Sequence, residues 1–155
     1  MATSTRFDDR TVVLTSEGRR RLEARLDASL SDLEDLDRRV ATSEQRDEEL
    51  ETRARLVERV RSFRETLQRA VDVDAVEEDP TIIELGDEVE IEHEDGEREH
   101  LLLVHPIELD AERGHVPVDS PLGVALLGQR VGDQVEVDSP GGRYRIRVID
   151  RARGH

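Results

Sequence analysis

The chain lacks cysteine and tryptophan, and all 23 of its basic residues are arginine. Without cysteine it can form neither disulfides nor thiolate metal sites. Aromatic residues are scarce as well, because the sequence contains only Phe7, Phe63 and Tyr144. Small-molecule pockets are usually lined by aromatic and apolar side chains, so the composition does not indicate an enzyme.

Long apolar runs are also missing from the sequence. None approaches the roughly 20 residues that a helix needs to span a bilayer. Residues Met1 to Asp9 are polar and lack the apolar stretch of a secretion signal. We therefore expect a cytoplasmic protein that makes no contact with a membrane.

Acidic residues dominate the chain, which has a net charge of −15 at pH 7. Nucleic acids attract basic surfaces, so this charge argues against direct nucleic-acid binding. The charge is unevenly placed: residues 16–71 have 14 acidic and 13 basic side chains, whereas residues 72–155 have 22 and 8. This difference predicts two domains.

The first half has the pattern of a helical coiled coil. Thr15 and Ser16 are suitable helix caps, and no proline or glycine occurs from Arg19 to Val71. Seam positions recur at steps of three and four residues, which is coiled-coil spacing. They are Leu22, Leu26, Ser29, Leu33, Leu36 and Val40, and then Leu56, Val60, Phe63, Leu67 and Ala70.

Between the two seams we expect the chain to reverse, near Arg39 to Thr42. Thr42 and Gln45 match the spacing of a capping box that would begin a second helix. Residues 1–71 are thus predicted to form an antiparallel hairpin with its tip near residues 39–51. Each arm of about 25 residues would be roughly 38 Å long. One continuous helix is the alternative.

Residues 72–85 are predicted to be an acidic linker, and residues 86–155 a small domain rich in β-strands. Val89 and Ile91 alternate with acids, Gly96 lies in a turn signal, and later apolar pairs alternate in the same way. Ser120, Pro121 and Gly128 mark the cap, the first residue and the end of one short helix. An antiparallel sheet with one helix is an α+β domain.

The most specific motif in the chain is the run SPLGVALLGQRVGD at residues 120–133, followed by PGG at residues 140–142. This run closely resembles the C-terminal domain of the bacterial Gre transcript cleavage factors. Gly86 to Val89 (GDEV) resembles the strand that opens the same domain, and Val13 to Gly18 (VLTSEG) resembles the start of the family's N-terminal helix.

The resemblance implies an FKBP-like C-terminal domain and an N-terminal coiled coil. It also implies a protein that binds RNA polymerase, with the globule at the mouth of the secondary channel and the hairpin inside it. We expect the protein to be a monomer. Asp119, Ser120 and Pro121 match the family segment that contacts polymerase; the same residues also suit helix capping. An FKBP-like shape does not itself imply prolyl isomerase activity.

The predicted tip departs from the family pattern. Gre tips resemble GDLSEN, whose aspartate and glutamate help to hold a Mg²⁺ ion at the polymerase active site. Here Glu44 aligns with the glutamate, but Ala41 takes the place of the aspartate and cannot ligate a cation. Other acids crowd the region, and the acidic tip is Glu44, Asp47, Glu48, Glu49 and Glu51.

Two mechanisms remain open. A protein without the acidic pair would occupy the channel and regulate or inhibit transcription without stimulating cleavage. Alternatively, Asp47 or Glu48 replaces the missing aspartate and cleavage survives. In neither case is the protein itself an enzyme, and we expect no cofactor of its own beyond contact with polymerase-bound Mg²⁺. A regulator of nucleoside-diphosphate kinase of the Rnk type, with a shorter stalk, is a third alternative.

Overall fold

The computed structural model describes residues 11–154; the polar stretch Met1 to Asp9 and His155 lie outside the described residues. The described chain divides into two compact units. One is a helical unit of residues 11–12 and 17–70, and the other is a globular unit of residues 71–154 together with Val13–Ser16. The α+β class is confirmed.

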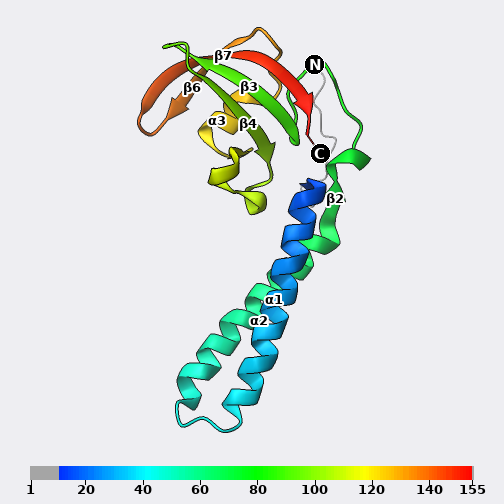
Figure 1. Ribbon diagram of the computed structural model, residues 1–155, viewed down its shortest axis with the longest axis vertical. Coiled ribbons are helices and arrows are strands. Elements are labelled where there is room, and N and C mark those ends of the chain that lie inside the picture. Colours follow the sequence, from blue (N-terminus) through cyan, green and yellow to red (C-terminus); the bar gives the residue numbers. More distant parts are fainter. Residues whose placement is uncertain (1–10, 155) are drawn as a thin grey trace. The chain divides into compact units, whose positions relative to one another are not determined.

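The helical unit is a hairpin of two antiparallel helices, α1 (Ser16–Val40) and α2 (Arg46–Arg69) (Figure 1). The predicted reversal is therefore confirmed, and the alternative of one continuous helix is wrong. Leu22, Ser29 and Leu36 are buried along α1, and Val60 and Phe63 along α2, as the seams predict. Polar contacts add to this packing: Arg53 of α2 donates to Asp37 of α1 over 2.6 Å.

The connection between the helices differs from the predicted capping box. Helix α2 begins at Arg46, and its N-cap is Gln45, whose side chain makes no capping hydrogen bond. The Thr42 hydroxyl instead donates back to the Arg39 carbonyl over 3.4 Å. The predicted box fails because Thr42 completes the turn that follows α1 and is not available to α2.

The globular unit is built on a five-stranded sheet in the order β5-β4-β3-β7-β6. Its strands are β3 (Asp87–His93), β4 (Arg98–Val104), β5 (His115–Pro117), β6 (Gln134–Ser139) and β7 (Gly142–Arg153). All neighbours are antiparallel except β4 and β5, which pair in parallel. The expected antiparallel sheet is thus corrected at one edge. Two 3-10 turns, Pro106–Glu108 and Ala111–Arg113, lie between β4 and β5 and return the chain to the same sheet edge.

The core of the globule lies between this sheet and helix α3 (Pro121–Leu126). Alternating residues of the central strands point inward, including Val89 and Ile91 of β3, and Ile146 and Val148 of β7. Leu126 of α3 is fully buried among them. The remaining strands, β1 (Val12–Leu14) and β2 (Ala70–Asp72), form a separate two-stranded sheet.

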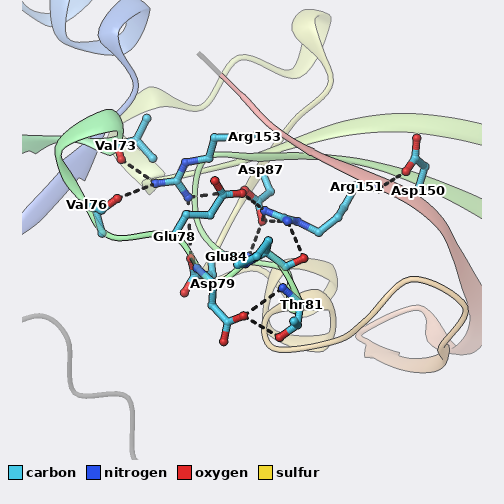
Figure 2. A network of polar contacts seen from close by, with 11 residues as sticks. Val73, Val76, Glu78, Asp79, Thr81, Glu84, Asp87, Asp150, Arg151 and Arg153 are labelled. Carbon is cyan, nitrogen blue, oxygen red and sulfur yellow. Dashed lines mark hydrogen bonds and ion pairs between the residues drawn. The ribbon is translucent and has the colours of Figure 1, made fainter.

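The segment predicted to be an acidic linker is ordered by polar contacts. It contains the end of β2 and a 3-10 turn, Val73–Ala75, and the side chains of Val73 and Ile83 are buried. Arg153 of β7 donates to the Val73 carbonyl over 2.6 Å (Figure 2). Arg151 donates to the Pro80 carbonyl over 2.9 Å. The segment is therefore attached to the last strand of the globule.

Asp87 lies at the centre of these contacts and is fully buried. Its carboxylate accepts hydrogen bonds from Arg151 Nε at 3.1 Å and from the backbone N–H of Glu84 at 2.8 Å. Arg151 also pairs with Glu78 (Figure 2). Burial alone would lower the pKa of Arg151, but its hydrogen bonds to Asp87 and Glu78 raise it, so the guanidinium stays charged.

Candidate functional site

The hairpin tip is a short loop of residues 41–45 that is folded by local hydrogen bonds. The backbone N–H of Thr42 donates to the Arg39 carbonyl over 3.0 Å, and the N–H of Gln45 donates to the Ser43 hydroxyl over 3.0 Å. Ala41 and Glu44 are exposed in this loop. Ala41, which aligns with the expected aspartate, is thus at the surface of the tip, and its methyl side chain cannot bind a cation.

The acidic residues of the tip fall into two groups. Glu44, Asp47 and Glu48 are exposed, and no ion pair with another described residue engages their side chains. Glu51 instead pairs with Arg55 at 3.6 Å, and Glu49 is only half exposed, with Oε2 buried. Of the five predicted site residues, the structure therefore leaves three available to a partner.

Helix electrostatics explain part of this cluster. Asp47, Glu48 and Glu49 occupy the first turn of α2, where negative charge complements the helix dipole. Glu44 precedes the helix and lies outside that turn. Among the described residues, no three histidine or acidic side chains are grouped closely enough to hold a metal ion.

The second predicted site, Asp119 to Pro121, follows β5 and ends at the first residue of α3 in the globular unit. The Ser120 hydroxyl accepts from the Gly123 N–H at 3.1 Å and donates to the Pro117 carbonyl at 2.6 Å. Ser120 is thus a true helix cap, and Pro121 is the first residue of α3. Asp119 and Pro121 are exposed on either side of it.

Gly123 is required for this geometry. A Cβ at this position would lie 2.1 Å from the Pro117 carbonyl oxygen, which is a severe steric clash. The tight approach of α3 to the end of β5 holds Ser120 in its capping position. The Asp119–Pro121 segment is therefore held on its N-terminal side by the bond to Pro117 and on its C-terminal side by the bond to Gly123.

Two exposed apolar side chains of the globular unit were not predicted from the sequence. Val124 is 63% exposed on α3, and Leu109 is 56% exposed after the Pro106–Glu108 turn. The helical period could have identified Val124, because Leu122 and Leu126 share the inward face and Val124 lies between them. Leu109 has no such pattern, since it follows an irregular turn.

The charge of Asp119 in this segment acts on the pKa of His105. Burial lowers the pKa of His105, although the charges of Glu108 and Asp119 act in the opposite direction. Its Nδ1 accepts a hydrogen bond from the backbone N–H of Ile107 at 3.2 Å. Both burial and this bond favour the neutral imidazole.

Comparison with known proteins bears on the family of the chain. The family model "Transcription elongation factor, GreA/GreB, C-term" matches residues 78–151. A solved structure, the GreA factor homolog 1 (Gfh1) of Thermus thermophilus, is 31% identical, with 92% of this chain and 99% of that chain covered and a TM-score of 0.42. The chain belongs to the GreA/GreB family.

Curated GreA proteins match different fractions of the chain. The GreA of Geobacillus kaustophilus is 36% identical over 92 residues, which are 59% of this chain and 58% of that protein. The GreA of Chloroflexus aggregans is 29% identical over 147 residues, or 88% and 94% of the two chains. Asp119, Ser120 and Pro121 lie inside the range matched by the family model, whereas the hairpin tip lies outside it.

No helix among residues 11–154 combines the length and the apolar character that crossing a membrane requires.

Proposed function

We propose that this protein is a Gre-like transcription factor that binds RNA polymerase at the secondary channel and regulates transcription without stimulating transcript cleavage. Membership of the family supports polymerase as the partner. The protein would act in the cytoplasm as a monomer, and it would modify catalysis by polymerase without being an enzyme itself.

We infer the absence of cleavage from Ala41, which is exposed in the tip loop. Cleavage factors of this family use two carboxylates to help hold a Mg²⁺ ion and to orient the attacking water, and Mg²⁺ prefers oxygen ligands. With Ala41 in place of one carboxylate, Glu44 remains the only acid of that pair. The tip would then occupy the channel without completing the ion's coordination.

A cleavage factor is the second candidate, and one observation favours it. Asp47 and Glu48 are exposed in the first turn of α2, close in sequence to Glu44, and no ion pair engages them within residues 11–154. Either carboxylate could act in place of the missing one.

Purified protein added to backtracked polymerase complexes distinguishes the two candidates. The proposal expects slower nucleotide addition and no shortening of the RNA 3′ end. Rapid shortening that is lost in Glu44→Ala or Asp47→Ala would establish the cleavage factor instead. Glu58→Ala is the matched control, because Glu58 is an exposed acid on the shaft of α2, away from the tip.

Binding is tested separately through the globular unit. Asp119→Asn removes an exposed charge from the segment while leaving the Ser120 cap intact. Weaker binding of this variant to polymerase is expected. Unchanged binding of both Asp119→Asn and Pro121→Ala would show that polymerase is contacted elsewhere.

A further inference from the structure

A groove of about 770 Å³ runs along the helical hairpin between α1 and α2. Both helices belong to the same unit, so the groove is internal to the hairpin. It is lined by Asp32, Asp35, Leu36, Arg38, Arg39, Thr52, Arg55, Leu56 and Arg59. Its volume falls within the range of small-molecule sites, which is about 300 to 1,000 Å³.

The lining of this groove is basic, although the chain as a whole is acidic. Four arginines and two aspartates give it a net charge of +2, in a protein whose net charge is −15. An excess of positive charge in a concave surface attracts small anions. Arg38 and Arg39 also lie in the last turn of α1, where positive charge complements the helix dipole.

The four arginines differ in their partners. Arg38 pairs with Asp35 at 2.7 Å, and Arg55 pairs with Glu51 at 3.6 Å. For Arg39 and Arg59, the structure of residues 11–154 shows no salt bridge or side-chain hydrogen bond. Two guanidinium groups in the groove are therefore available to a ligand.

Guanidinium chemistry indicates the class of ligand. The planar fork of arginine matches phosphate oxygens in two parallel hydrogen bonds, and two such forks suit a ligand with several phosphate groups. Leu36 and Leu56 supply the apolar part of the lining, but no aromatic side chain is present to stack on a base. Recognition would therefore depend on the phosphates and be indifferent to the base.

The charge surrounding the groove favours a compact anion over a nucleic-acid strand. Exposed acids of the same hairpin that no ion pair within residues 11–154 engages, Glu44, Asp47 and Glu48, would repel a strand that extends beyond the groove toward the tip. A compact anion would remain within reach of the arginines and avoid this repulsion.

We propose that this groove binds a compact oligophosphate, such as the triphosphate of a free nucleotide, through Arg39 and Arg59. The proposal is independent of cleavage and of polymerase binding, because it concerns the isolated hairpin groove. It predicts that inorganic tripolyphosphate and nucleoside triphosphates bind with similar affinity.

Isothermal titration of the full chain with inorganic tripolyphosphate and with ATP tests the proposal. Saturable binding at one site is expected, with Arg39→Ala and Arg59→Ala each weakening it roughly tenfold, as the loss of one charge-assisted contact implies. Arg39→Lys, which keeps the charge but not the fork, should weaken binding less. Arg64→Ala is the control, because Arg64 is exposed on α2 outside the groove and changes the net charge equally.

Three results would overturn the proposal. The first is the absence of saturable binding by either ligand. The second is an equal loss of affinity in Arg64→Ala, which would show attraction by bulk charge alone. The third is tighter binding of a short single-stranded RNA than of tripolyphosphate with the same dependence on Arg39 and Arg59, which would identify a strand as the ligand. Circular dichroism of each variant shows whether the hairpin remains folded.

Discussion

Glu108 accepts two hydrogen bonds from Thr15, although 93 residues separate them in the chain. The backbone N–H of Thr15 donates over 3.0 Å and its hydroxyl over 2.5 Å. Both residues are buried, and Thr15 immediately precedes helix α1. Thr15 and Glu108 both belong to the globular unit, so this contact joins two distant segments of one unit.

Replacement of Glu108 by alanine should destabilise the globular unit. Two buried donors of Thr15 would lose their acceptor, and an unsatisfied buried group costs about 1 to 3 kcal/mol. We expect the free energy of unfolding to fall by about 3 kcal/mol. Tyr144, the only tyrosine, lies in the globule and reports its unfolding by fluorescence in denaturant titrations. Glu112→Ala, at an exposed position nearby in sequence, should change stability by less than about 0.5 kcal/mol.

The buried pair of Asp87 and Arg151 should be equally sensitive. Removing one partner of a buried ion pair leaves an uncompensated charge and costs about 3 to 5 kcal/mol. Since Glu78 still contacts Arg151, we expect Asp87→Ala to lower the free energy of unfolding by about 3 kcal/mol. In the double variant with Arg151→Ala, the loss should be smaller than the sum of the single losses. Arg143→Ala, with a side chain 69% exposed, is the control, and additive losses would show that the two residues act independently.

Gly123 and Gly141 offer a matched pair of glycine substitutions. Gly123→Ala would place a Cβ 2.1 Å from the Pro117 carbonyl, whereas at Gly141 the nearest contact would be an ordinary 4.0 Å. We expect Gly123→Ala to cost about 3 kcal/mol, because backbone must move to admit the methyl group. Gly141→Ala should be nearly neutral in the same denaturant titration. Similar stabilities for the two variants would mean that α3 can shift away from β5 at little cost.

Local patterns predicted most of this fold, and the failures have physical causes. The heptad spacing of Leu22, Ser29 and Leu36 predicted the hairpin, and the Ser120-Pro121 signal predicted α3, because each depends only on neighbouring residues. The parallel pairing of β5 could not be predicted, since it depends on a return through irregular turns.

The polar contacts of Asp87 and Glu108 were missed for the same reason. Each joins residues more than 60 positions apart, and one sequence does not reveal such pairs. In the candidate site, the tip acids were identified by composition, but only the structure separated Glu51, which pairs with Arg55, from the exposed Glu44.

His105 should make the stability of the globule depend on pH. Burial lowers its pKa below the ordinary 6.5, so the folded state favours the neutral ring. A lowered histidine pKa means that the unfolded state binds a proton first as the pH falls. The stabilisation is therefore complete above about pH 7 and is lost as the pH falls through about 6.5 toward the folded pKa.

Denaturant titrations between about pH 7.5 and pH 5.5 measure this effect. In His105→Asn, the side-chain oxygen can still accept from the Ile107 N–H, and the decline in stability across this range should be smaller than in the unaltered chain. His100→Gln, at an exposed position on β4, should retain the full decline. An identical pH profile for His105→Asn and the unaltered chain would assign the decline to other groups.

Ala41 is the residue that distinguishes the two proposed mechanisms, because it replaces one carboxylate of the family's acidic pair. Ala41→Asp adds a carboxylate to the exposed tip loop, where it could join Glu44 at a polymerase-bound Mg²⁺ ion. If the missing acid is what prevents cleavage, RNA shortening in backtracked complexes should accelerate by about tenfold, equivalent to about 1.4 kcal/mol of transition-state stabilisation.

The control for Ala41→Asp must add the same charge elsewhere on the hairpin. Ala54→Asp does so at an exposed position of α2, well along the shaft, and should leave cleavage unchanged. Acceleration in both variants would point to bulk negative charge, which requires no particular geometry at the tip. No acceleration in Ala41→Asp, with binding to polymerase intact, would show that one restored carboxylate is insufficient and that the tip does not deliver its acids to the ion.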